Sequence, residues 1–195
     1  MQPAPRIVLA STSKYRRELL ARLGLPFEVA SPGVEEIPLP HETPPDTARR
    51  LAEAKARAVA ARFPQAIVIG SDQVAVLDGT TLGKPGNHAN AVRQLKTMRA
   101  KEVVFHTALC LCNAASGQSE TRVVSFWVRF RNYSDAQIES YLRREQPYDC
   151  AGSAQSEGLG IALIAEMRGN DPNALIGLPL IALTEMLAAQ GVSVL

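Results

Sequence analysis

The sequence predicts an α/β or α+β fold built around a mixed β-sheet. Near the N-terminus a buried strand at Ile7–Ala10 is followed by a helix at about Lys14–Leu23 and a short strand at Phe27–Ala30. This alternation favours parallel pairing of the strands. Further along, Val123–Phe130 carries apolar residues at every second position, which is typical of a half-buried strand. A chain of 195 residues suits a single domain over residues 1–195, or two closely joined lobes.

Cap and turn residues predict where the other elements begin and end. Gly24 is expected to end the first helix, and Asn87 to cap a helix that runs to about Met98. Ser134 and Gln137 form a predicted capping box for a helix to about Arg144. The remaining expected elements are a helix at 45–63, strands at 67–70 and 73–77 before an Asp78-Gly79 turn, a strand at 103–112 antiparallel to 123–130, a strand at 158–164, and a last helix from about Pro179 to just before Gly191.

Charge and composition argue against several classes of protein. With 21 basic and 19 acidic residues, the net charge of +2 gives no general case for nucleic-acid or membrane binding. The apolar runs are too short to span a bilayer or to form a signal-peptide core, so we expect a cytoplasmic protein. Three cysteines argue against a disulfide framework, and Cys110 and Cys112 are expected to be core residues.

A turn rich in hydroxyls and cations, residues 11–17, follows the first strand. A helix N-terminus offers free N–H groups and the positive end of the helix dipole to an anion. Lys14, Arg16 and Arg17 are unfavourable at that end of the helix unless an anionic ligand offsets them. The alternative is a serine N-cap followed by solvated basic residues, and the residues alone do not decide between the two.

The segment Gly79–Lys84 is superficially similar to a P-loop. It has three residues between its glycines instead of four, and Pro85 stands where the Mg²⁺-binding hydroxyl is needed. We therefore exclude a P-loop. Lys84 is still expected to bind phosphate from a loop, because Pro85 fixes the backbone beside it.

Acidic residues follow two predicted strands. Asp72 lies where the strand ending at Gly70 stops, and Glu35 and Glu36 follow another short strand. Ligands of α/β sheets gather at the carboxyl ends of strands, and Mg²⁺ prefers carboxylate oxygens. The alternative is a turn aspartate and two surface glutamates. The residues alone leave open which of the two glutamates faces inward.

Together these segments resemble the Maf family of nucleotide pyrophosphatases from Ile7 to about Leu187. Each motif is weak alone, but their occurrence in the family's order is highly specific. Lys14 is a departure, because many members carry proline there. The matching pieces are Leu9-Ala10-Ser11-Thr12-Ser13 with Arg16-Arg17, Glu36, Lys55, Gly70-Ser71-Asp72-Gln73-Val74, Gly83-Lys84-Pro85, Cys150-Ala151-Gly152-Ser153, Ser156-Glu157-Gly158, Asp171-Pro172-Asn173 and Gly177-Leu178-Pro179.

The resemblance implies an α/β fold of the Maf/ITPase-like kind. Such a fold has a mixed, twisted, elongated sheet flanked by helices, with two lobes around a central cleft. The resemblance also implies a homodimer. Its activity would be hydrolysis of a nucleoside triphosphate between the α- and β-phosphates, with Mg²⁺ or Mn²⁺ as the cofactor. Neither nucleic acid nor membrane is an expected partner.

The resemblance also assigns roles to residues. Asp72 matches the family's proposed proton acceptor, and Glu36 matches a carboxylate near the metal and the catalytic water. Both are expected to bind the metal, and Lys84 is expected to assist catalysis. Residues expected to hold the substrate's phosphates or to lie beside them are Ser11, Ser13, Arg16, Lys55 and Lys84.

Three positions suggest the 7-methyl-GTP pyrophosphatase branch. Gln73 and Glu157 stand where the dTTP/UTP-cleaving branch typically carries Thr and Gln, and Tyr15 is an aromatic at a third such position. The methylated guanine is cationic, so an aromatic face would attract it by roughly 0.5–2 kcal/mol. We expect Glu157 to accept hydrogen bonds from the guanine N1–H and amino group, which contribute roughly 1.5–3 kcal/mol each.

For the mechanism we predict direct attack of water on the α-phosphorus, because the sequence has no G-x-S-x-G elbow and no histidine with an evident nucleophile. Three alternatives remain. One is the same chemistry on dTTP or UTP. The second is a non-catalytic nucleotide-binding regulator of cell division, a role with which the family's name is associated. A weaker one is a nucleic-acid-binding module, which the near-neutral charge disfavours.

Overall fold

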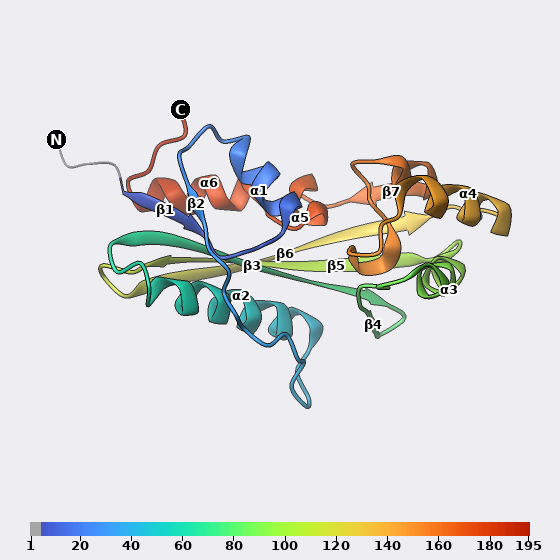
Figure 1. The fold of residues 1–195 in the computed structure, drawn as a ribbon, viewed down its shortest axis with the longest axis horizontal. Coiled ribbons are helices and arrows are strands. Elements are labelled where there is room, and N and C mark those ends of the chain that lie inside the picture. The colour runs from blue at the N-terminus through green and yellow to red at the C-terminus, as the bar shows by residue number, and fades with distance from the viewer. Residues whose placement is uncertain (1–4) are drawn as a thin grey trace. The chain divides into compact units, whose positions relative to one another are not determined.

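The structure is a computed structural model that describes residues 5–195. Its strands form one sheet in the order β2-β1-β3-β5-β6-β7, with β4 paired to β3 (Figure 1). Pairing is parallel for β1 with β2 and β3, and antiparallel for β3 with β4 and for β6 with β7. This confirms the predicted mixed sheet. The strands are β1 Arg6–Leu9, β2 Glu28–Val29, β3 Ala66–Leu77, β4 Thr80–Leu82, β5 Glu102–Asn113, β6 Gln118–Phe130 and β7 Ile164–Arg168.

Local capping fixes several of the helices. Ser13 and Asn87 cap the helices that follow them, and Ser134 and Gln137 form the predicted capping box. No helix within the described residues is long and apolar enough to cross a membrane. The helices are α1 Lys14–Ala21, α2 Pro44–Ala60, α3 His88–Met98, α4 Asp135–Glu145, α5 Pro172–Ile176 and α6 Leu180–Ala189, with 3₁₀ turns η1 Ala151–Ser153 and η2 Leu159–Leu163.

The chain divides into two compact units that interleave along the sequence. The first unit consists of the residues up to Gln73 with Thr107–Val124 and Asp171–Leu195, and the second of Val74–His106 and Ser125–Asn170. Strands β3, β5 and β6 each contribute residues to both units. A single domain over residues 1–195 and a central cleft stay predictions.

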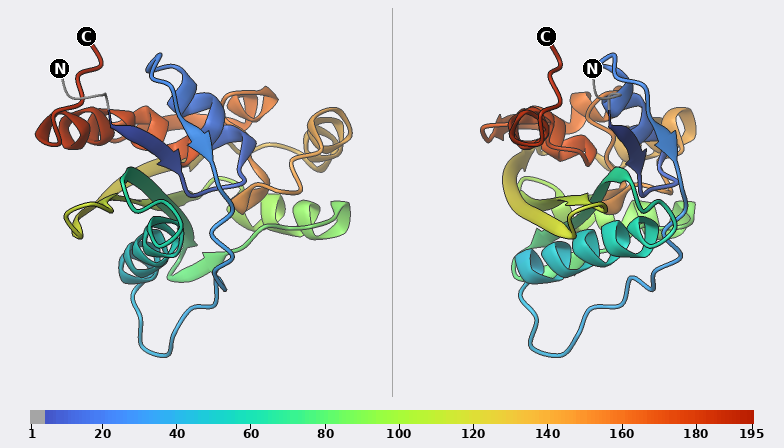
Figure 2. Two further views of the ribbon diagram at one scale, coloured as in Figure 1. Left: turned by 60° about the vertical axis from the view of Figure 1, so that its left-hand side comes forward. Right: turned by 90° about the vertical axis from the view of Figure 1, so that its left-hand side faces the viewer.

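The first unit has helices on both faces of its strands. Figures 1 and 2 show α2 on one face and α1 with α6 on the other. Parallel pairing sets Ile7 opposite Ile67 and Leu9 opposite Ile69, and all four side chains join the core beneath α1 and α6. On the α2 face, a Cβ on Gly70 would collide with the Ala52 backbone oxygen. Helix α2 therefore lies directly against the part of β3 that leads to Asp72.

The second unit contains the predicted turn at Asp78-Gly79 and the helices α3 and α4. Strands β3 and β4 are joined at Asp78-Gly79, where both residues have positive φ, of 49° and 79°. Such a turn matches the twist of the strands that it connects. Helix α3 packs against α4 and η1. The Tyr133 hydroxyl donates a hydrogen bond of 2.8 Å to the Leu95 carbonyl, which ties the start of α4 to α3.

The strand predicted at residues 158–164 is wrong. The turn η2 occupies most of this segment, and an extended strand begins only at Ile164. A side-chain oxygen of Glu145 accepts a hydrogen bond of 2.8 Å from the Leu159 N–H, and Gly160 packs against the Gln155 backbone. These contacts with residues outside the segment bend it, although its apolar composition is also that of a strand. Strands β4 and β7 and helix α5 were not among the predicted elements.

Candidate active site

Two serines organise the turn between β1 and α1. The Ser11 Oγ accepts a hydrogen bond of 3.1 Å from the Ser13 N–H, and the Ser13 Oγ accepts one of 3.4 Å from the Arg16 N–H. The serine N-cap considered from the sequence is therefore present. Because both hydroxyls act here as acceptors, each keeps its own proton for donation to an anion.

Arg16 reaches from α1 to the loop that follows α5. Its Nε donates a hydrogen bond of 2.8 Å to the Gly177 carbonyl, which also accepts one of 2.9 Å from the Ser71 hydroxyl. Gly177 has φ of 120°, a conformation that side chains rarely adopt. Burial lowers the pKa of the Arg16 guanidinium, and Asp72 and Glu36 act in the opposite direction. The guanidinium of Arg16 therefore lies close enough to Asp72 and Glu36 for a favourable electrostatic interaction with both carboxylates.

A buried lysine joins the two predicted carboxylates. The Lys55 Nζ lies 2.6 Å from Asp72 Oδ1 and 2.6 Å from Glu36 Oε1. The Lys55 side chain is 4% exposed and that of Asp72 is 7% exposed, whereas Glu36 approaches from the surface. Of the two glutamates that the sequence left open, Glu36 is the one that contacts Lys55. Helix α2 and strand β3 bring Lys55 and Asp72 together.

The environment of Asp72 alters its basicity. Burial raises the pKa of Asp72 above its usual value, and the charge of Glu36 acts in the same direction. Lys55 and Arg16 oppose this shift in the pKa. A carboxylate with a raised pKa is a stronger base than one in water. The cluster holds two cations and two carboxylates, so its formal charge is balanced before any ligand binds.

Gln73 contacts helix α5 through its amide nitrogen. Its Nε2 lies 2.8 Å from the Ala174 carbonyl oxygen, 3.0 Å from that of Leu175 and 2.9 Å from Thr107 Oγ1. Backbone carbonyls only accept hydrogen bonds, so the nitrogen must face α5 and the amide oxygen must face elsewhere. The Thr107 hydroxyl donates 2.8 Å to Ala174 as well. Gln73 thus fixes the position of α5 beside Asp72.

The sequence did not indicate two buried hydroxyls that support this site. Ser71 and Thr107 are both fully buried, and both donate to carbonyls in the segment around α5. Ser71 lies in the Gly70-Ser71-Asp72 motif, which was a usable signal. Thr107 sits inside a long strand, where threonine is common, so nothing in the local sequence marks it.

The motif that begins at Asp171 has a structural role. Its Oδ1 accepts a hydrogen bond of 3.0 Å from the Asn173 N–H, and its Oδ2 accepts one of 2.7 Å from the Ile181 N–H. One buried carboxylate therefore caps the N-termini of both α5 and α6. This double cap orients the turn that contains Gly177.

Tyr15 is already in contact with a cation. The Lys14 ammonium lies 4.7 Å from the centre of the Tyr15 ring, at a cation–π distance. Lys14 is the position at which the sequence departs from the family pattern. The aromatic face predicted to attract a methylated guanine is therefore shared with the chain's own ammonium group.

Lys84 and Glu157 belong to the second unit. Lys84 is exposed on a loop whose flanking carbonyls, those of Gly83 and Pro85, each accept a hydrogen bond of 2.8 Å from a side chain of α3. Glu157 is exposed, and its Oε2 accepts a bond of 3.4 Å from the Ser156 hydroxyl. Their participation in the same site as Asp72 stays a prediction.

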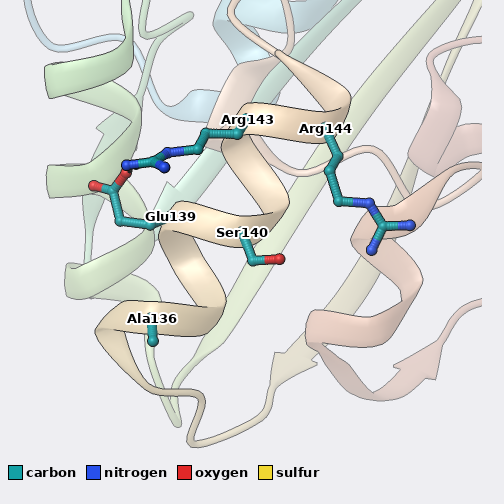
Figure 3. A pocket seen from close by; sticks show the side chains of 5 residues that line it. All are labelled: Ala136, Glu139, Ser140, Arg143 and Arg144. Carbon is teal, nitrogen blue, oxygen red and sulfur yellow. Dashed lines mark ion pairs between the residues drawn. The ribbon is translucent and has the colours of Figure 1, made fainter.

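The exposed side of α4 carries a shallow hollow that contains no predicted site residue (Figure 3). All of its lining residues come from this one helix, and the Arg143 Nε lies 3.7 Å from Glu139 Oε2. It is a helix surface and not a site built from several elements. The lining residues are Ala136, Glu139, Ser140, Arg143 and Arg144.

The fold and the first unit define the class of protein. It is an α/β protein with a cluster of opposite charges where helix α2 packs on strand β3. In this cluster Lys55 contacts the carboxylates of Asp72 and Glu36. A family model described as Maf-like protein matches residues 6–190. The chain belongs to the Maf family.

Named relatives match the chain over nearly its whole length. A protein of Methylobacillus flagellatus named 7-methyl-GTP pyrophosphatase is 63% identical over 191 residues, which cover 98% of this chain and 100% of the relative. Proteins with the same name from Nitrosospira multiformis and Thiobacillus denitrificans are 59% and 60% identical. These matches cover 99% and 98% of this chain, and 98% and 96% of the relatives.

Proposed function

We propose that this chain hydrolyses 7-methyl-GTP to 7-methyl-GMP and pyrophosphate. The observation that carries the proposal is the buried Lys55 ammonium, 2.6 Å from Asp72 and within the same cluster as Arg16. Such a cluster combines positive charge for phosphate groups with a carboxylate base. The near full-length similarity to relatives of that name supports the choice of substrate.

Phosphate binding is assigned to the turn between β1 and α1 and to the cations around it. Ser11 and Ser13 donate their hydroxyl protons, while Arg16 presents the part of its guanidinium that does not bind Gly177. Two of the three N–H groups of Lys55 bind carboxylates, which leaves one for a phosphate oxygen. Lys84, from the second unit, is proposed to bind the same triphosphate.

Asp72 is proposed to activate water. It accepts a proton from the water as the water oxygen bonds to the α-phosphorus, and the bond from that phosphorus to the bridging oxygen of pyrophosphate breaks. The raised pKa of Asp72 makes this proton transfer less unfavourable. Arg16 and Lys55 offset the negative charge that develops on the phosphate oxygens.

The donors present fit a hard divalent cation. Asp72 and Glu36 offer carboxylate oxygens, which Mg²⁺ and Mn²⁺ prefer, and they would hold the ion together with the substrate's phosphates. Among residues 5–195, no group of three or more histidine, cysteine or acidic residues forms a complete metal cage. When bound, the ion would supply positive charge to the phosphates and lower the pKa of nearby water.

Recognition of the base is assigned to Glu157 and Tyr15. Glu157 would accept hydrogen bonds from guanine, and Tyr15 would contact the cationic ring system. Gln73 would contribute through the position of α5, which its amide group fixes.

We further propose a cytoplasmic homodimer that acts on nucleotides and binds neither nucleic acid nor membranes. Light scattering that gives a monomer mass at micromolar concentration would remove the dimer from this proposal.

A pyrophosphate-release assay tests the function. The panel consists of 7-methyl-GTP, GTP, dTTP and UTP with Mg²⁺ or Mn²⁺, and we expect the highest kcat/KM with 7-methyl-GTP.

Asp72→Asn should lower kcat about 10²-fold or more, because it removes the base, while the exposed control Asp78→Asn retains activity. Glu157→Gln should lower the preference for 7-methyl-GTP over dTTP, with Glu120→Gln as its control. Preferred cleavage of dTTP or UTP, or an active Asp72→Asn protein, contradicts the proposal.

A further inference from the structure

One ammonium group occupies the space between the two carboxylates that would bind a metal. Lys55 Nζ lies 2.6 Å from an oxygen of Asp72 and 2.6 Å from an oxygen of Glu36. Those two oxygens are therefore no more than twice this distance apart. A divalent ion held by Asp72 and Glu36 would draw on the same negative charge that this ammonium group now compensates. Lys55 and the ion would thus compete for these two carboxylates.

Burial makes this competition unequal in the protein without substrate. The Lys55 side chain is almost fully buried, and its ion pairs are with these two carboxylates. An incoming ion would have to lose water and would leave a buried ammonium group without a partner. Both losses are unfavourable. Arg16 adds a second positive charge that acts on both carboxylates and opposes a divalent ion further.

A triphosphate changes this balance. Its oxygens provide several of the ligands that the ion needs, and they also offer the ammonium group a new anionic partner. Lys55 can then exchange a carboxylate contact for a phosphate contact, and its buried positive charge still has an anionic partner. This step rests on the proposed function, because it requires that the cluster receives a triphosphate.

We infer that Lys55 controls the order of binding: the protein without nucleotide does not hold a divalent ion at Asp72 and Glu36, and the ion enters only with the triphosphate. Lys55 is thus a positioning residue for the metal as well as a phosphate ligand. Replacing Lys55 with a neutral side chain should create a two-carboxylate ion site in the free protein.

The test measures Mn²⁺ binding without any turnover, from the loss of the electron paramagnetic resonance signal of the hydrated ion. Free wild-type protein should leave this signal essentially unchanged, and K55M should increase Mn²⁺ affinity about tenfold or more. The double substitution K55M with D72N should cancel that gain. Arg57→Met is the control, since Arg57 is an exposed cation on the same helix. Lys55→Arg, which keeps the charge, covers the case in which K55M does not fold.

Three results would overturn the inference. One is a wild-type protein that binds Mn²⁺ without nucleotide as tightly as K55M does, with D72N abolishing that binding. The second is a folded K55M protein that gains no Mn²⁺ affinity over wild type. The third applies if K55M does not fold, and is Mn²⁺ binding by Lys55→Arg far above that of wild type. A non-hydrolysable α,β-methylene analogue of 7-methyl-GTP should restore binding to wild type. Failure of the analogue alone would count against the proposed substrate, because the comparison of free proteins involves no nucleotide.

Discussion

At the scale of residues, the site depends on compensation of buried charge. Asp72 and Lys55 are both almost fully buried, and the ion pair between them offsets the cost of removing each charge from water. The same burial raises the pKa of Asp72, which suits a proton acceptor. Glu36 completes the cluster from the solvent side. The proposed triphosphate would enter a site whose own charges already cancel, so it would have to replace existing ion pairs and not simply add new ones.

Lys14 yields a prediction about substrate choice. Its ammonium lies 4.7 Å from the centre of the Tyr15 ring, where, on the proposed function, it would compete with a cationic base for the ring and repel that base. Lys14→Met should therefore raise the ratio of kcat/KM for 7-methyl-GTP over GTP by about two- to fivefold. The two nucleotides carry the same phosphates, so the ratio isolates the effect on the base. Arg17→Met, an exposed cation of the same turn, should leave the ratio unchanged. An equal change for both substrates in Lys14→Met would contradict this role.

Local residue patterns predicted what depends on local contacts. Ser13, Asn87 and Ser134 cap helices through bonds to residues three positions away, and such caps can be read from sequence. Lys55 was identified only through the family resemblance, because its contact with Asp72 depends on how α2 packs on β3. The same holds for the contact of Gln73 with α5, which joins residues about a hundred positions apart.

At the scale of elements, the close approach of α2 to β3 positions Lys55 against Asp72. Gly70 has no room for a side chain, because the Ala52 backbone oxygen and the Ala56 backbone nitrogen occupy that space. Gly70→Ala should push α2 away and lower the free energy of unfolding by about 1–3 kcal/mol or more. It should also weaken activity, since Lys55 moves with α2. Urea denaturation measures the first effect, with Gly83→Ala as a control because its surroundings are open. Wild-type stability in Gly70→Ala would contradict this packing.

Glu42 fixes the loop that leads from Glu36 into α2. It accepts hydrogen bonds from the Arg50 guanidinium, the Leu39 N–H and the Thr47 hydroxyl. These contacts, foremost those with Arg50, lower the pKa of Glu42 to about 2. A lowered pKa stabilises the folded state above the unfolded pKa of about 4.3, and this contribution is lost as the pH falls towards 2.

Urea denaturation at several pH values checks the role of Glu42. The wild-type protein should lose more stability between about pH 5 and pH 2 than Glu42→Gln does, because the variant lacks this titrating group. Glu120→Gln serves as the comparison for loss of an exposed carboxylate. Identical acid dependence in wild type and Glu42→Gln would show that the loop is not held in this way.

The elements that sequence reasoning missed are those whose conformation depends on distant residues. The segment before β7 is apolar enough for a strand, but the Glu145 carboxylate and the Gln155 backbone hold it as a 3₁₀ turn. Helix α5 has only five residues, too few for a periodic pattern to reveal. By contrast, α2 was predicted within a few residues because it is long and rich in strong helix formers.

At the scale of the whole molecule, the proposed chemistry draws on both units. Asp72, Lys55, Glu36 and Arg16 are joined within the first unit, which supplies the base and the charge balance. In the proposal, Lys84, on a loop fixed by α3, and Glu157 would come from the second unit. Family membership was predictable from motifs spread along almost the entire chain, and several of them, such as Ser71-Asp72-Gln73 and Asp171, make contacts that hold the first unit together.

The central claim is that water attacks the α-phosphorus of 7-methyl-GTP at Asp72. Hydrolysis in water enriched in oxygen-18, followed by mass spectrometry of both products, tests this directly. We predict that the heavy oxygen appears in 7-methyl-GMP and that the pyrophosphate remains unlabelled. Label in the pyrophosphate, or release of 7-methyl-GDP and phosphate, would contradict the account.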